Sequence, residues 1–217
     1  PRLIEAVLPR LAGPPVPPPH PTPHGVLGPL ADALALATAG QEICYTRLPL
    51  GWNGAYSRWR HPLDYIGHDG GAGVGSGPGI AVGAALALQG TERLAVAVMG
   101  DGDFLMGQHA VWTAAHLRLP SVWVVCNNRA FYNDQRHQER IATVRGRSTA
   151  SSGVGQSLTD PPIDIAAVAR AQGAVAFGPV TADESLVATL REALTTARRG
   201  HIVVVDVEVA PGYDHRG

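Results

Sequence analysis

Two short, continuous runs of apolar residues constrain the fold of this chain more than any other feature. Leu94–Met99 reads Leu-Ala-Val-Ala-Val-Met, and Ser121–Cys126 is a second run of the same kind. Strands that face water on one side alternate apolar and polar residues, whereas continuous runs are typical of strands buried on both faces of a parallel sheet. The sequence therefore predicts a buried sheet that includes these two segments.

The rest of the chain alternates predicted helices and strands around these two runs. Helices are predicted at Pro29–Thr38, Ile80–Leu88, Gly107–Leu117, Ile163–Gln172 and Asp183–Arg198. Further strands are predicted at Ile43–Leu48, Ala174–Val180 and Ile202–Val209. Such alternation implies an α/β fold, a doubly wound parallel sheet with helices on both faces. The polar, Gly- and Ser-rich stretch Thr143–Pro162 lacks apolar periodicity and is predicted to be a long loop.

The beginning of the chain has a different composition from the rest. Residues 1–25 are predicted to hold a short helix, ending near Leu8, and an extended linker with seven prolines between Pro14 and Pro23. Residues 26–217 are predicted to form one α/β domain. Because the chain opens at Pro1 without a methionine, we expect it to be part of something longer, or a processed or separately encoded part.

Composition argues against several classes of function. The formal net charge of −1 gives no electrostatic footprint for nucleic acid or an anionic membrane. No apolar run approaches the roughly 18 residues that would span a bilayer. The two cysteines, Cys44 and Cys126, match no zinc or redox spacing and are expected to be buried apolar thiols. A cytoplasmic enzyme is the default expectation.

Polar residues follow both buried runs, at the edge of the sheet where ligands collect in open α/β folds. Gly100-Asp101-Gly102-Asp103 follows the first run, and Asn127-Asn128-Arg129-Ala130 follows the second. The carboxylate of Asp101 and the amide oxygen of Asn128 are hard oxygen ligands of the type that Mg²⁺ prefers. Gly100 and Gly102 would let the backbone approach a diphosphate closely, and the helix start that follows favours an anion.

Gly100-Asp101-Gly102 followed by Asn127-Asn128 resembles the motif of thiamine diphosphate (ThDP) enzymes, in particular the C-terminal diphosphate-binding domain of the acetolactate synthase and benzoylformate decarboxylase group. The resemblance implies that Asp101 and Asn128 bind Mg²⁺ through their side chains and that the Ala130 carbonyl completes the protein ligands. Many relatives carry Ser where this chain has Asp103, so the aspartate would act through its backbone N–H or point its carboxylate away. The cofactor contacts implied by the resemblance are Asn53, Val74, Gly75, Gly100, Gly102, Asp103, Asn128 and Phe131.

A glycine-rich turn upstream adds to the resemblance. Residues 73–79 read Gly-Val-Gly-Ser-Gly-Pro-Gly and are similar to the turn that carries an apolar wedge between the two rings of ThDP in this family. The wedge position falls on Val74, which is smaller than the usual Leu, Ile or Met; the alternative is a tight helix-entry loop without cofactor contact. The Gly-x-Gly-x-x-Gly dinucleotide fingerprint fails for lack of its third glycine. His68, Tyr132, Asn133 and His137 could line a substrate pocket or be plain loop and helix residues.

One residue that the family needs is missing from this sequence. The resemblance implies a glutamate bonded to the cofactor pyrimidine, contributed by a separate pyrimidine-binding domain, and no glutamate here has a matching context. We therefore expect an oligomer in which another chain or a missing segment supplies that domain. The implied chemistry is decarboxylation of a small 2-oxoacid followed by carboligation, as in acetolactate synthase. A simple benzoylformate- or pyruvate-type decarboxylase and a non-catalytic module with the same fold are the alternatives.

Overall fold

The computed structural model describes residues 26–57, 59–67, 73–181 and 184–212 of the 217-residue chain. The helix and the proline-rich linker predicted for residues 1–25 lie outside the described residues, so the proposed division of the chain at residue 26 stays a prediction.

Five strands form one parallel sheet in the order β1-β2-β3-β5-β4. The strands are β1 (Ile43–Arg47), β2 (Leu94–Gly100), β3 (Ser121–Asn127), β4 (Val175–Thr181) and β5 (Ile202–Glu208). All five coincide with predicted strands to within one residue at either end. The two continuous apolar runs become the adjacent strands β2 and β3 inside the sheet, which explains why neither shows a polar face.

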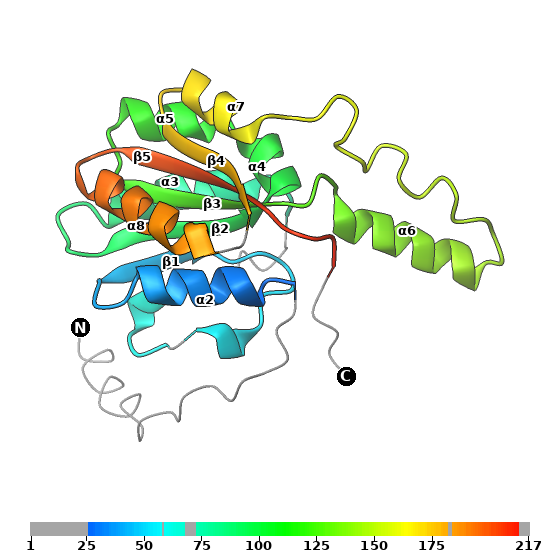
Figure 1. Cartoon of the computed structure of the whole chain (residues 1–217), viewed down its shortest axis with the longest axis horizontal. Helices are drawn as coiled ribbons and strands as arrows, with labels where there is room; N and C mark the ends of the chain where they lie inside the picture. Colours follow the sequence, from blue (N-terminus) through cyan, green and yellow to red (C-terminus); the bar gives the residue numbers. More distant parts are fainter. Residues whose placement is uncertain (1–25, 58, 68–72, 182–183, 213–217) are drawn as a thin grey trace.

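Helices cover both faces of the sheet, as Figure 1 shows. One face is covered by α2 (Gly28–Ala37) and α8 (Glu184–Arg198). The other face is covered by α3 (Ser76–Ala87), α4 (Asp101–Gly107), α5 (Ala110–His116) and α7 (Ile165–Ala171). The predicted doubly wound α/β fold is therefore confirmed. Two short 3-10 helices, η1 (Gly54–Tyr56) and η2 (Pro62–Asp64), lie between β1 and α3.

The core divides into two layers because side chains alternate across the sheet. Val96 and Val98 of β2 pack under α2 and α8, whereas Ala97 and Met99 pack on the opposite side. Each fully buried valine or methionine contributes about 1.5–3 kcal/mol relative to an exposed side chain. These layers hold the carboxyl ends of β1, β2 and β3 in fixed register and so position the residues that follow them.

Two helices begin earlier than predicted. The helix expected from Ile80 begins at Ser76, after Gly75 takes a left-handed conformation (φ +93°) at the N-cap. The single helix expected at Gly107–Leu117 is instead two helices, α4 and α5, and α4 begins directly at Asp101. Asp101 and Asp103 thus lie in the first turn of a helix, where acidic side chains are favoured.

The prediction of a loop from Thr143 is wrong at its beginning, because Thr143 and Val144 end a helix that the sequence analysis did not predict. This helix, α6 (Tyr132–Val144), contains no buried residue and extends away from the body of the molecule (Figure 1). The segment is mostly polar, so it lacks the apolar residues from which the other helices were predicted. Within the described ranges, no helix is both long and apolar enough to cross a membrane.

Candidate functional site

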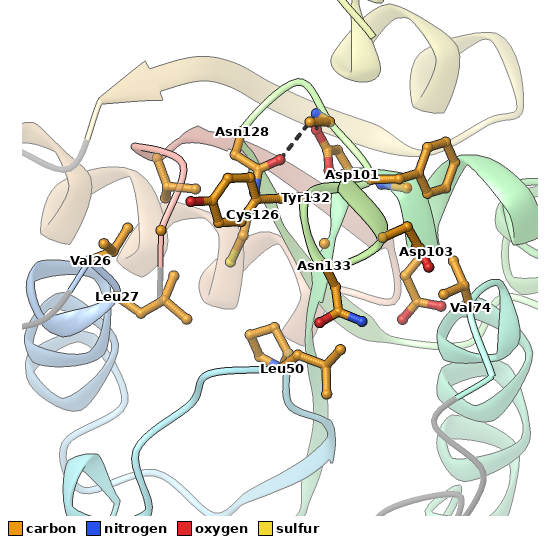
Figure 2. Close-up of a pocket in the computed structure, with 18 of the residues that line it drawn as sticks. Val26, Leu27, Leu50, Val74, Asp101, Asp103, Cys126, Asn128, Tyr132 and Asn133 are labelled. Carbon is orange, nitrogen blue, oxygen red and sulfur yellow. Dashed lines mark hydrogen bonds between the residues drawn. The ribbon is translucent and has the colours of Figure 1, made fainter. Parts of the chain in front are cut away.

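A pocket opens at the carboxyl ends of β1, β2 and β3, where the sequence placed its candidate residues (Figure 2). Its walls come from the last residue of β1, the first turn of α4, the glycine-rich turn and the segment that leads into α6. The lining includes Arg47, Val74, Gly100, Asp101, Gly102, Asp103, Cys126, Asn128, Ala130, Phe131, Tyr132, Asn133 and Asp134. Segments that are far apart in the chain therefore meet at one edge of the sheet.

Asp101 and Asn128 are brought together by a shared backbone donor. The N–H of Ala130 donates to Oδ2 of Asp101 at 3.2 Å and to Oδ1 of Asn128 at 3.1 Å. The N–H of Gly102 donates to the other carboxylate oxygen, Oδ1 of Asp101, at 2.9 Å. The side-chain oxygens that follow two successive strands thus lie close together in the pocket, and their predicted role as metal ligands stays a prediction.

The surroundings of Asp101 suit a cation. The residue is only 2% exposed, and burial raises its pKa to about 6, although N–H groups of the backbone partly offset the effect. No ion pair to Asp101 is found among the described residues. A buried carboxylate without a cationic partner is costly, and a divalent cation would remove that cost.

The available donors are those of a hard metal. No cluster of three or more His, Cys, Asp and Glu side chains is present in the described part of the chain. A cation at Asp101 would therefore rely on one carboxylate, one amide oxygen and backbone carbonyls, with water and phosphate completing its shell. That is the donor set of Mg²⁺ rather than of zinc.

The first asparagine of the motif has a different, structural role. Nδ2 of Asn127 donates to Oδ1 of the buried Asp206 at 3.0 Å and so ties β3 to β5. Oδ1 of Asn127 accepts from the N–H of Arg129 at 3.2 Å, where the chain takes a left-handed conformation (φ +59°). Burial raises the pKa of Asp206, and the hydrogen bond from Asn127 works against this rise. Asn127 therefore fixes the turn that presents Asn128.

Asp103 lines the pocket but directs its carboxylate to the protein. Oδ1 accepts from the N–H of Gly75 at 2.7 Å and from the N–H of Gly77 at 3.2 Å. Oδ2 accepts from Nε of Arg47 at 3.0 Å. Of the two arrangements expected for an aspartate at this position, the structure shows the one in which the carboxylate is engaged elsewhere.

The remaining predicted contacts surround these carboxylates. Val74 is 43% exposed and lines the pocket beside Asp103 (Figure 2). Gly102 lies under the ring of Phe131, and a Cβ at Gly102 would stand 2.5 Å from that ring. A Cβ at Gly75 would lie 2.9 Å from Cβ of Met106, so the glycine-rich turn packs tightly on α4. By contrast, a Cβ at Gly100 would meet no atom of the described residues within 4 Å.

Only some of the residues predicted to line a substrate pocket lie in the pocket lining. Tyr132 and Asn133 line the pocket at the start of α6, whereas His137 lies one turn further along this helix and outside the pocket lining. Asn53 is also outside the lining, and its Oδ1 caps η1 by accepting from the N–H of Ala55 at 3.0 Å. His68 lies outside the described residues. The roles predicted for Asn53 and His68 stay predictions.

Sequence reasoning missed several residues of the pocket, among them Arg47 and the thiol of Cys126. Arg47 is a single charged residue at the end of an otherwise uncharged strand, and such a break in the pattern was the available signal. Both cysteines are buried and free, as predicted. Burial, reinforced by the charge of Asp101, raises the pKa of Cys126 to about 12. Cys126 therefore forms a neutral wall of the pocket.

Fold and site together define an α/β cofactor-binding domain with its ligand edge at β1, β2 and β3. Residues 50–207 match the family described as thiamine pyrophosphate enzyme, C-terminal TPP binding domain, and the chain belongs to this family. The family inferred from Gly100-Asp101-Gly102 and Asn127-Asn128 is thereby confirmed.

Individual relatives match over most of the domain but over a minor part of their own length. The chain is 31% identical over 139 residues to a benzoylformate decarboxylase of Pseudomonas aeruginosa, a match that covers 64% of this chain and 24% of the relative. A thiamine diphosphate-dependent 4-hydroxybenzoylformate decarboxylase of Rhodococcus jostii RHA1 superposes with a TM-score of 0.66 at 25% identity, over 85% of this chain and 32% of that one. A benzoylformate decarboxylase of Polynucleobacter necessarius has the same fold (TM-score 0.66, 22% identity, 89% of this chain and 34% of that one).

Proposed function

We propose that this chain is the diphosphate- and Mg²⁺-binding part of an enzyme that decarboxylates a small 2-oxoacid with ThDP. One observation carries the proposal: in a chain of this family, the buried Asp101 carboxylate and the Asn128 amide oxygen meet at the carboxyl edge of the sheet. Asp101, Asn128 and the carbonyl of Ala130 would hold the metal. When bound, ThDP supplies the reacting carbon and accepts the electron pair left by the departing CO₂.

The rest of the pocket would bind and orient the cofactor. Gly100 would let the diphosphate approach the backbone, because a Cβ there would stand in open space of the pocket, whereas Gly102 makes room for the ring of Phe131. The exposed Val74 and the adjacent Gly75 would contact the rings, and Phe131 would close the side above Gly102. Tyr132 and Asn133, at the mouth of the pocket, are candidates for contact with the substrate.

We further propose that a pyrimidine-binding domain completes the site from another chain or from a segment outside this sequence. No glutamate lines the pocket formed by the described residues, so the group expected to activate the cofactor must come from elsewhere. The chain spans about a quarter of the curated relative and about a third of the solved relatives, which leaves room for such a domain. Either a homo-oligomer or a hetero-oligomer could bring the pyrimidine-binding domain to this pocket.

The acyl unit that remains after loss of CO₂ has two fates. Capture by a second carbonyl would make the enzyme an acetolactate synthase-like carboligase, the fate that the motifs alone led us to expect. Protonation would make it a simple decarboxylase. The relatives named above are decarboxylases of benzoylformate and 4-hydroxybenzoylformate, which favours an aromatic 2-oxoacid as the first substrate to test.

The test starts with the protein purified gently from its source, followed by a native mass spectrum and a product assay. A species that contains a second polypeptide, ThDP and Mg²⁺ and releases CO₂ from benzoylformate or pyruvate supports the proposal. An aldehyde product identifies a decarboxylase, and a hydroxyketone identifies a carboligase. Full turnover by this chain alone would contradict the need for a partner domain. Absence of metal-dependent ThDP binding would point to a non-catalytic module.

A further inference from the structure

We propose that Asp103 is a positioning residue that holds the glycine-rich turn of residues 73–77 in place, rather than a contact to the cofactor diphosphate. The inference rests on the proposed function, because the turn matters for the cofactor through Val74. The family resemblance led us to expect either a diphosphate contact through the backbone N–H of Asp103 or a carboxylate that points away, and the proposal gives the carboxylate of the second arrangement a role.

Hydrogen bonds connect Asp103 to the glycine-rich turn. One oxygen of Asp103 accepts from the N–H groups of both Gly75 and Gly77, at 2.7 and 3.2 Å. These two donors flank the start of α3, and the first of them, Gly75, directly follows Val74 in the chain. Hydrogen bonds to a charged acceptor are stronger than neutral ones, so the carboxylate fixes the turn better than a hydroxyl would.

The negative charge of Asp103 is compensated within the protein. Asp101 and Asp103 both border a pocket proposed to receive a diphosphate, and an uncompensated carboxylate there would repel it. The other oxygen of Asp103 is paired with Nε of Arg47 at 3.0 Å, and the two side chains are only 10% and 9% exposed. This buried ion pair neutralises Asp103 and links the turn to the end of β1. An aspartate can therefore occupy the position without opposing the anion.

The glycine-rich turn packs closely against α4. A Cβ at Gly77 would stand 2.4 Å from Oδ2 of Asp103, and a Cβ at Gly107 would stand 2.5 Å from the carbonyl oxygen of Gly75. Both glycines thus allow α4 and the turn to approach closely enough for the hydrogen bonds to form. The turn, Asp103 and Arg47 are therefore linked by hydrogen bonds and close contacts, and the side chain of Val74 in this turn is exposed.

The experiment compares two probes on the full chain with its co-purified partner: Mg²⁺ with ThDP, and Mg²⁺ with inorganic pyrophosphate. Dissociation constants are measured by calorimetry for wild type, Asp103→Asn and Asp103→Ser. The serine variant retains a residue that many family members carry and so guards against a failure to fold. If Asp103 positions Val74 against the cofactor rings, both variants should bind ThDP about tenfold more weakly than wild type. Their affinity for pyrophosphate then stays within about twofold of wild type, because the metal ligands are untouched.

The matched control is Asp64→Asn. Oδ2 of Asp64 accepts from two backbone N–H groups, at 2.7 and 2.8 Å, and Oδ1 pairs with Arg93 at 2.8 Å, outside the pocket. This variant removes the same kind of interaction and should leave both dissociation constants unchanged. Faster amide hydrogen exchange at Gly75 and Gly77 in the two Asp103 variants, measured without cofactor, gives an independent reading of the turn.

The outcomes separate the inference from the proposed function. If the Asp103 variants lose affinity for ThDP and for pyrophosphate equally, Asp103 contacts the diphosphate, and the positioning role is overturned. Unchanged ThDP affinity together with unchanged exchange at Gly75 and Gly77 would overturn it as well. If wild type itself binds neither probe in a Mg²⁺-dependent way, the proposed function fails, and the positioning role fails with it.

Discussion

Asp101 and Asn128 accept hydrogen bonds from the same backbone N–H, that of Ala130, at 3.2 and 3.1 Å. The two residues directly follow the ends of β2 and β3, and the shared donor keeps their oxygens close together in the pocket. Because the donor is part of the backbone, either side chain can be replaced without removing it. This relationship makes the contribution of each residue separable by experiment.

Asn127 and Asn128 should differ sharply when each is changed to alanine. Asn127→Ala leaves the buried Asp206 without its side-chain donor and should lower the free energy of unfolding by about 1–3 kcal/mol. Asn128→Ala removes a half-buried amide that lines the pocket, so it should change stability little. It should, however, weaken Mg²⁺-dependent ThDP binding at least tenfold. Urea unfolding and calorimetric titration of the two variants check this. Equal effects on stability would contradict the division of roles.

The stability of the metal-free protein should depend on the titration of Asp101. Burial raises its pKa from the ordinary 3.8 to about 6, so the folded state binds the proton more tightly than the unfolded state does. The stability contributed by the protonated form is fully present below about pH 4 and is lost as the pH rises through about 6, a loss of about 3 kcal/mol. Asp101→Asn should not show this loss. Unfolding curves of both proteins between pH 4 and 7, in the presence of EDTA, measure the difference.

The ionisation of Asp101 should also control the affinity of the site for Mg²⁺. Mg²⁺ binds the ionised carboxylate and competes with the proton, so its affinity should rise between pH 5 and pH 7 and then level off. Metal-dependent pyrophosphate binding, followed at several pH values, gives the profile. A flat profile through pH 6 would mean that Asp101 does not ligate the metal.

Gly77 and Gly79 offer a matched pair within the first turns of α3. Gly77→Ala places a methyl group 2.4 Å from Oδ2 of Asp103 and should destabilise the fold by about 1–3 kcal/mol. A Cβ at Gly79 meets nothing within 4 Å in the described structure, so Gly79→Ala should be neutral or stabilise by up to about 1 kcal/mol. Thermal unfolding distinguishes the two. A tolerated Gly77→Ala would show that the turn can move away from Asp103.

The fold was predictable from sequence where burial left a clear pattern. The apolar runs that became β2 and β3 are buried on both faces, and their ends could be placed to within one residue. The helix α6 was not predicted, because its sequence is mostly polar and none of its residues contributes to the buried core. The start of α4 was also missed, since Gly-Asp-Gly is typical of a turn and only packing shows that it begins a helix.

The candidate site was predictable where chemistry depends on residue type, and not where it depends on contact. Asp101 and Asn128 could be proposed from their positions after two buried strands. The pairing of Asp103 with Arg47 joins residues 56 positions apart, and no local pattern signals such a partner. The structural use of Asn127 depends in the same way on Asp206, which belongs to a strand near the end of the chain.

The most direct test of the central claim is a calorimetric titration of the purified protein with ThDP, once with Mg²⁺ and once with EDTA, for wild type and Asp101→Asn. We expect saturable binding by wild type that requires Mg²⁺, and a loss of about a hundredfold or more in affinity for the variant. Binding that survives EDTA, or that is the same in wild type and Asp101→Asn, would contradict the proposal that Asp101 and Asn128 hold the cofactor through a metal ion.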